Sequence, residues 1–134
     1  MAVEIPVVRL YAACEEIRIE AGSPKVSLRN VFHRVVRLPG EPFPCVCEQM
    51  ALYALLANGR GEHVFRVELT SLDEGAERMV FQSPSRQVDL GQDPVTVHGL
   101  PISRMRVRFD EAGQYTFHLI CDGRRIAEYH VEVR

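Results

Sequence analysis

The fold is indicated first by residues 105–133, which read MRVRFDEAGQYTFHLICDGRRIAEYHVEV. Apolar side chains occupy every second position in three runs, Met105–Phe109, Tyr115–Cys121 and Ala127–Val133, and the turn signals DEAG and DG separate these runs. A period of two is typical of strands with one buried face, and short turns containing glycine join such strands into hairpins. The stretch therefore predicts three antiparallel strands connected by two hairpin turns.

The two turns also predict a register for these strands. Matching the apolar faces places three residues side by side on the inner face: Val107, Phe117 and Tyr129. Two rows then stand on the outer face: Arg106 with His118 and Glu128, and Arg108 with Thr116 and His130. These outer rows are a candidate site for an anionic partner. We favour a cross-strand charge ladder that stabilises the sheet, since charged outer faces are expected of antiparallel sheets.

The rest of the chain continues the pattern of short extended segments divided by glycine and proline. Lys25–Arg37 reads as extended with a bend near Asn30, and His63–Leu69 alternates cleanly. Segments 7–16 and 48–57 each fit a strand or a short helix, although the turns that bound the second favour a strand. In the first, the predicted core face consists of Val8, Leu10, Ala12 and Cys14. Together these segments predict one all-β domain over residues 1–134, an antiparallel β-sandwich of about 7–9 strands.

The composition excludes several classes of protein. The chain has 134 residues, of which 46% are hydrophobic and 25% charged, and its formal net charge is −2. This balance gives no general attraction to nucleic acid or to an anionic membrane surface. The first residues do not resemble a signal peptide, and no stretch reaches the roughly 18 apolar residues of a membrane-spanning helix. We therefore expect a cytoplasmic protein that binds neither nucleic acid nor membrane.

The four cysteines, Cys14, Cys45, Cys47 and Cys121, offer two interpretations. In a reducing compartment the default is a free thiol that packs as a small hydrophobic side chain. The C-x-C pair Cys45 and Cys47 would bind a metal only if the fold added further ligands, such as His63, because the spacing alone does not make a zinc site. We favour structural thiols and expect no cofactor.

The segment Leu38–Pro44, LPGEPFP, is the most distinctive loop of the chain. Its three prolines, Pro39, Pro42 and Pro44, would stiffen it and reduce the entropy lost on binding a partner. Phe43 is then a candidate anchor in a partner-binding loop that extends to Cys45 and Cys47. The alternative is that Phe43 and Cys45 fill one end of the core.

Two stretches carry a resemblance to a known family. They are VSLRNVFHRV at residues 26–35 and FDEAGQYTFHLICDGRRIAEYHVEV at 109–133, which contains the pattern G-x-Y-x-F-x-L-x-x-D-G. Together they resemble a family of uncharacterised bacterial proteins with an immunoglobulin-like β-sandwich, although Asn30 replaces the family's usual glycine. The resemblance implies that fold and a bacterial origin, and it assigns no catalytic residue. Gly113-Gln114-Tyr115 is also similar to the corner at which a tyrosine hydroxyl ties down the start of a strand in immunoglobulin-like domains.

No sequence motif for catalysis or for phosphate binding occurs in the chain. The leading hypothesis is a non-enzymatic interaction module that binds another protein, or a second copy of itself through an edge strand. The runner-up is a ligand- or metal-binding sandwich that uses the Pro-rich loop with Cys45 and Cys47. A small enzyme is the third hypothesis. If a site exists, we expect it between Leu38 and Cys47.

Overall fold

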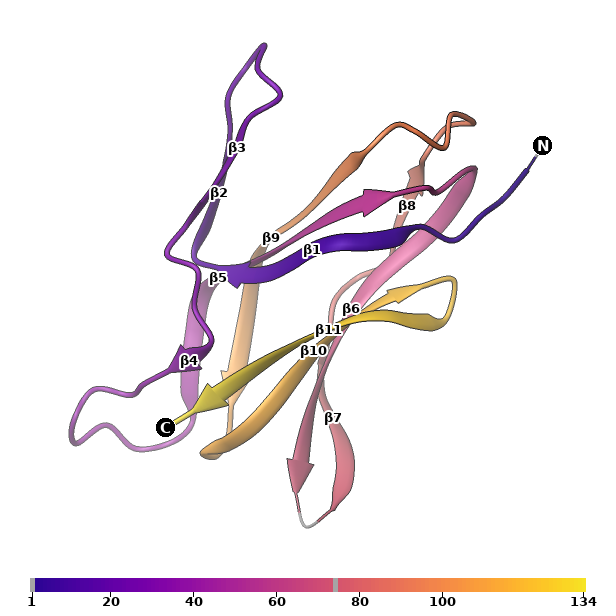
Figure 1. Ribbon diagram of the computed structural model, residues 1–134. Coiled ribbons are helices and arrows are strands. Elements are labelled where there is room, and N and C mark those ends of the chain that lie inside the picture. Colours follow the sequence, from indigo (N-terminus) through magenta and orange to yellow (C-terminus); the bar gives the residue numbers. More distant parts are fainter. Residues whose placement is uncertain (1, 74) are drawn as a thin grey trace.

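The computed structural model describes residues 2–73 and 75–134, and these form eleven β-strands in an all-β architecture (Figure 1). Segments 7–14 and 48–57 lie in strands, so the helical alternative is wrong for both. No helix that could span a membrane is found among the described residues. The strands are β1 Val7–Cys14, β2 Glu16–Ile19, β3 Val26–Arg29, β4 Arg34–Val35, β5 Cys45–Ala57, β6 Glu62–Asp73, β7 Ala76–Gln82, β8 Arg86–Asp89, β9 His98–Phe109, β10 Gly113–Cys121 and β11 Arg124–Val133.

Two sheets make the body of the domain, and a hairpin projects from it. One sheet has the order β1-β5-β9. The other has the order β4-β11-β10-β6-β7, with β8 also paired to β6. All pairs within these sheets are antiparallel except β4 with β11. The third sheet is the hairpin of β2 and β3, which extends away from the body in Figure 1.

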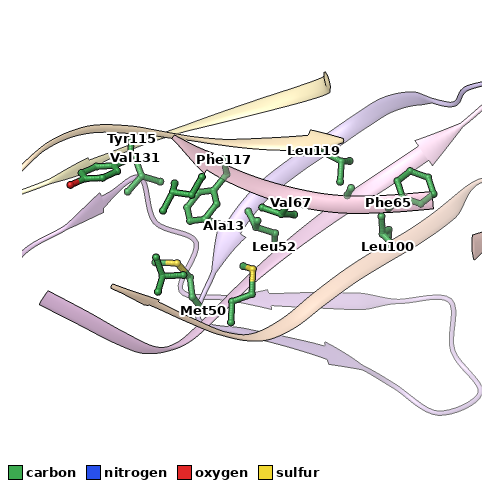
Figure 2. Close-up of a cluster of buried hydrophobic side chains, with 14 of the residues drawn as sticks. Ala13, Met50, Leu52, Phe65, Val67, Leu100, Tyr115, Phe117, Leu119 and Val131 are labelled. Atoms are coloured by element: carbon green, nitrogen blue, oxygen red, sulfur yellow. The ribbon is translucent and has the colours of Figure 1, made fainter. Parts of the chain in front are cut away.

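The hydrophobic core lies between the two larger sheets. In Figure 2, Val67 and Phe117 point from one sheet toward Leu52 of the other. Each of these side chains is at most 1% exposed. The alternation predicted for His63–Leu69 and Tyr115–Cys121 is confirmed, because the apolar set of each run faces this core.

The predicted hairpin between β9 and β10 is wrong. Strand β9 pairs with β5, whereas β10 pairs with β6 and β11, so the turn after Phe109 carries the chain from one sheet to the other. Val107 and Phe117 are therefore both core residues, but they lie in different sheets and do not pair. Alternation defines which face of a strand is buried but not which strand lies beside it, so both arrangements fit the same sequence. The rings of Phe109 and Tyr115 pack edge to face, with centroids 4.9 Å apart, where the chain crosses.

The second hairpin is confirmed in its predicted register. Phe117 pairs with Tyr129, His118 with Glu128 and Thr116 with His130. The members of each predicted outer row that lie on β10 and β11 are therefore correct. The predicted arginine members, Arg106 and Arg108, belong to the other sheet. Their places beside β10 are taken by residues of β6, which are Glu68 and Thr70.

The predicted core face of β1 is partly wrong. A bulge between Val8 and Leu10 shifts the phase of the strand, and the side chain of Leu10 is 46% exposed. Val8 packs on the core and Ala12 and Cys14 are buried as predicted, but Tyr11 and Ala13 also pack on the core. A bulge places one unpaired residue in a strand, which turns the following side chains to the opposite face. The bend predicted near Asn30 is confirmed by a left-handed backbone, with φ 55°.

The tyrosine corner expected at Gly113-Gln114-Tyr115 has the predicted hydrogen bond. The hydroxyl of Tyr115 donates to the carbonyl oxygen of Glu111 at 2.7 Å, and the ring is 2% exposed. This bond closes the turn at which the chain passes between the sheets, so Tyr115 fixes the start of β10.

Removing this hydroxyl in the variant Tyr115→Phe is expected to lower the free energy of unfolding by about 0.5–1.5 kcal/mol, as for a typical hydrogen bond. The matched control is Tyr11→Phe. The Tyr11 hydroxyl is buried and has no hydrogen-bond partner in the described part of the chain, so its removal should leave stability unchanged or raise it. Urea unfolding of the two variants measures the difference, and equal losses would contradict the role given to Tyr115.

Candidate functional site

Two bulges distort the pairing of β5 with β9 near the middle of both strands. Glu48 and Gln49 of β5 lie opposite Arg106 alone, and Ser103 and Arg104 of β9 lie opposite Ala51 alone. Paired bulges of this kind bend both strands. Arg104 has a left-handed backbone with φ 59°, a conformation that is unfavourable for a side chain other than glycine and that is often found at functional positions.

A groove of about 450 Å³ lies beside this distorted part of β9. Its other wall is the segment that links β7 to β8. The floor is apolar, and the rim carries arginine and serine side chains; among the described residues, no acidic side chain lines the groove. The apolar residues are Phe65, Phe81, Leu100, Ile102 and Met105, and the arginines are Arg66, Arg86, Arg104 and Arg106.

Hydrogen bonds hold both walls of the groove in place. The hydroxyl of Ser83 accepts the N–H of Val67 at 2.8 Å, and the N–H of Ser83 donates to the carbonyl of Val67 at 2.9 Å. Arg86 donates from Nη1 to the carbonyl oxygen of Pro101 at 2.7 Å. The groove is therefore bounded by segments that are tied to β6 and to β9.

The four arginines differ in how much of their charge is neutralised. Arg66 pairs with Glu68, and Arg106 pairs with Glu48 at 3.1 Å. In the described part of the chain, Arg86 donates a hydrogen bond to a carbonyl oxygen but forms no ion pair, and Arg104 has no carboxylate partner. Positive charge beside an apolar floor suits a ligand that carries both an anionic and an apolar group.

The edge of β9 is poorly suited to pairing with another strand. Pro101 has no N–H to donate, its carbonyl is occupied by Arg86, and the bulge at Ser103–Arg104 interrupts the ladder. Proline and bulges are devices that protect edge strands from pairing. A ligand in the groove would therefore bind through its side chains.

The Pro-rich loop is only partly exposed. Phe43 and Cys45 pack against the core, as the alternative interpretation of the loop predicts. The guanidinium of Arg37 lies 4.0 Å above the ring of Phe43. Pro39, Pro42 and Pro44 remain exposed.

All four cysteines are free thiols. Burial, together with Cys45, raises the pKa of Cys47 to about 11, so this thiol is not ionised at neutral pH. Among the described residues, the one cluster with three metal-ligand atoms within 4.8 Å of each other lies elsewhere, at His63, Cys121 and Asp122. Among the described residues, the fold therefore places no third metal-ligand atom close to both Cys45 and Cys47.

The cluster at His63 is a structural network. Nδ1 of His63 lies 2.7 Å from Oδ2 of Asp122, and Nε2 lies 2.8 Å from the carbonyl oxygen of Arg60. The other oxygen of Asp122 accepts the N–H of Val64 at 2.8 Å. Burial raises the pKa of Cys121 to about 12. Every ring nitrogen and carboxylate oxygen of this cluster therefore already has a hydrogen-bond partner within the protein.

His118 lies at the centre of the outer face of the larger sheet and is 3% exposed. Its Nε2 lies 2.9 Å from the hydroxyl oxygen of Thr70. Burial lowers the pKa of His118, and the charge of Arg125 lowers it further. The imidazole is therefore neutral at pH 7. The sequence predicts its neighbour Glu128 but not Thr70, because pairing of β6 with β10 joins residues far apart in the chain.

The groove itself was not predicted. Its residues come from three separate parts of the chain, near 65, 81–86 and 100–106, and nothing in the sequence shows that these meet. One local signal was available: Pro101 interrupts a run that otherwise alternates, and proline within a strand indicates an exposed edge.

The fold and the groove define an all-β domain with two facing sheets and a cationic groove at one edge. More specifically, the chain belongs to DUF6941, a family of unknown function, whose model matches residues 9–134. A search of curated proteins found no match. Among solved structures, the chain is similar to the Pseudomonas fluorescens alkylpurine DNA glycosylase AlkC bound to DNA containing an abasic site analog, with a TM-score of 0.47 and 14% identity. The match covers 76% of this chain and 27% of that structure, and a likeness this distant carries no functional argument.

Proposed function

We propose that the chain is a non-enzymatic interaction module that binds an acidic segment of a partner protein in the groove beside β9. The observation that carries this proposal is the apolar floor rimmed by four arginines, with no acidic side chain in the lining that the structure describes. The partner segment would place apolar side chains on the floor and carboxylates beside Arg86 and Arg104. Arginine suits this task because its planar guanidinium binds a carboxylate through two hydrogen bonds.

The size and lining of the groove support a peptide over a nucleic acid. A nucleic acid needs an extended basic track, usually with exposed aromatic rings for stacking, whereas here two of the four arginines are paired with glutamates and Phe65 is 1% exposed. The side chains that line the groove are apolar, arginine or serine, and a nucleophilic serine would need a base beside it. These features favour binding over catalysis.

The proposed setting is the cytoplasm of a bacterium, and the proposed fold type is immunoglobulin-like. The free thiols are those expected of a reducing compartment, and the hydrogen bond of Tyr115 is typical of immunoglobulin-like corners. A homodimer would form through β7, which in the part of the chain that the structure describes pairs only with β6 and exposes Met79, because Pro101 hinders pairing at the edge of β9.

The proposal is tested with a fluorescent acidic–apolar peptide, Glu-Phe-Glu-Leu-Glu, whose binding is measured by fluorescence anisotropy at two salt concentrations. The variant Arg104→Glu is expected to weaken binding by roughly tenfold to a hundredfold, because a hydrogen bond to a charged group contributes about 1.5–3 kcal/mol. Higher salt should weaken binding of the wild-type protein. The matched control is Arg9→Glu, which makes the same charge change on β1, at the opposite edge of the sheet.

Equal affinity of the wild-type protein and Arg104→Glu for the peptide would overturn the proposal. So would equal binding of the basic peptide Lys-Phe-Lys-Leu-Lys. Tighter binding of a single-stranded oligonucleotide than of the acidic peptide would point to nucleic acid instead, and would equally contradict it.

A further inference from the structure

Two histidines and one glutamate meet on the outer face of the larger sheet, away from the groove. His118 of β10 is the cross-strand partner of Glu128 of β11, and His130 follows Glu128 by two residues on the same face. Nδ1 of His118 lies 3.8 Å from one carboxylate oxygen of Glu128, and Nε2 of His130 lies 3.8 Å from the other. The adjacent antiparallel strands that carry these residues are visible in Figure 1.

The remaining ring nitrogen of each histidine is held by a threonine. Nε2 of His118 lies 2.9 Å from the hydroxyl of Thr70, and Nδ1 of His130 lies 3.0 Å from the hydroxyl of Thr116. Both rings therefore direct the other nitrogen toward Glu128. Histidines that bind a metal are oriented in this way, by a hydrogen bond from the nitrogen that does not bind the ion.

The nitrogen of His118 that faces Glu128, Nδ1, lacks a hydrogen-bond partner among the described residues. It is buried, and 3.8 Å is too long for a hydrogen bond to Glu128. Buried polar atoms are nearly always bonded, so an exception needs an explanation. A ligand between the two groups would provide one.

Glu128 is also distinguished from its acidic neighbours. Glu68 pairs with Arg66, Glu77 with Arg125, and Glu132 with Arg34 and Arg134. In the described part of the chain, the groups with a nitrogen within 4.0 Å of the Glu128 carboxylate are the two histidines, and no arginine or lysine lies that close. Its carboxylate is therefore not neutralised by an arginine.

The carboxylate has a suitable spacing from each histidine, but Glu128 and His130 must turn toward His118 to share one ion, because the three ligand atoms do not all lie within 4.8 Å of one another. Two ligands that each lie about 2.1 Å from a tetrahedral zinc ion are roughly 3.4 Å apart, close to the 3.8 Å between each histidine nitrogen and the carboxylate. The side chains of Glu128 and His130 are 54% and 72% exposed, so they are free to adjust around an ion, whereas His118 is held in place. The cluster at His63 lacks this property, because its nitrogens and oxygens are all bonded within the protein.

We propose that His118, Glu128 and His130 form a binding site for a divalent transition-metal ion such as Zn²⁺. Two imidazole nitrogens and one carboxylate are a ligand set that zinc and its neighbours in the first transition series accept. Water would complete the coordination, since the sheet face is open on the side of His130. The site is independent of the groove and of Cys45 and Cys47.

The experiment is titration of the chelator-treated full chain with Zn²⁺ by calorimetry. We expect one ion per chain, and a loss of affinity of at least about tenfold in each of the exposed-ligand variants Glu128→Gln and His130→Ala. Thr116→Val, which removes the group that orients His130, should weaken binding by about tenfold. Testing His130 and Glu128 avoids relying on a variant of the buried His118.

Two controls keep the site distinct from other zinc ligands. His33→Ala removes an exposed histidine elsewhere, and the double variant Cys45→Ser with Cys47→Ser removes the C-x-C thiols; both should bind Zn²⁺ as the wild-type protein does. The absorption of bound Co²⁺ should lack a thiolate charge-transfer band. Less than about one ion per ten chains, unchanged affinity in both ligand variants, or loss of binding in the cysteine variant would each overturn the proposal.

Discussion

The variant Phe117→Ala is expected to lose about 3–5 kcal/mol of its free energy of unfolding, the range measured when a buried aromatic side chain is cut back to alanine. Phe117 is fully buried. It lies in β10, between β6 and β11, where it pairs with Leu69 and Tyr129. Its ring points from this sheet toward the opposite one (Figure 2), so its removal would leave a cavity at the contact between the two sheets. Stabilities of domains are only about 5–15 kcal/mol, and the loss would therefore be a large fraction of the total.

The matched control for this variant is Leu10→Ala. Alternation along β1 predicts a buried Leu10, whereas the structure leaves its side chain 46% exposed after the bulge. A surface substitution of this kind usually changes stability by less than about 0.5 kcal/mol. Urea unfolding followed by circular dichroism gives both values. A loss in Leu10→Ala comparable with that in Phe117→Ala would mean that β1 keeps its uninterrupted alternation.

The sequence predicts which side chains of a strand are buried more successfully than it predicts which strand pairs with it. Phe117 and Arg106 show why. A side chain's face depends on its neighbours along the strand, so the alternation around Phe117 is visible locally. Which strand lies alongside depends on distant residues. The alternation on both sides of the turn after Phe109 predicts a hairpin with Arg106 beside His118. In the structure, Arg106 instead pairs with Glu48 of β5.

The same limit applies to the candidate sites. Matching the apolar faces of β10 and β11 predicts the pair of His118 with Glu128. The two-residue turn alone would place His118 opposite Ala127, and a bulge between Leu119 and Ile120 produces the predicted register. Thr70, which orients His118, comes from β6 and could not be placed without the sheet order. The groove depends further on two bulges and on the backbone of Arg104, and bulges leave only weak signals in a single sequence.

His63 provides the second large expected effect, since its network joins the start of β6 to the turn between β10 and β11. The two groups that its ring nitrogens face, the carboxylate of Asp122 and the carbonyl of Arg60, are both acceptors. Only the doubly protonated imidazolium donates to both. The neutral ring has one N–H and leaves one of these acceptors without a donor.

The pKa of His63 reflects this arrangement. Burial lowers the pKa, but the hydrogen bonds to Asp122 and to the carbonyl of Arg60, with the charge of Asp122, outweigh burial and raise it above the ordinary value of 6.5. The folded protein therefore holds this proton more tightly than the unfolded chain. The stabilisation is complete below pH 6.5 and is lost as the pH rises through the raised pKa of the folded state. The pKa of Asp122 is lowered, first by its bond to the N–H of Val64, so its contribution is lost only in acid, as the pH falls below 3.8, its ordinary value.

The variant His63→Gln is therefore expected to lose about 2–4 kcal/mol at pH 6, where it gives up two hydrogen bonds from a buried cation. The difference in free energy of unfolding between the wild-type protein and this variant should then shrink steadily as the pH is raised from 6.5 toward 9. Subtracting the two unfolding curves removes the contributions of other titrating groups, including His118, whose lowered pKa acts in the opposite direction. A difference that stays constant over this range would show that His63 is neutral in the folded protein. The direction of the change is decisive because a neutral histidine satisfies only one of its two partners at every pH, whereas the imidazolium satisfies both until it loses its proton.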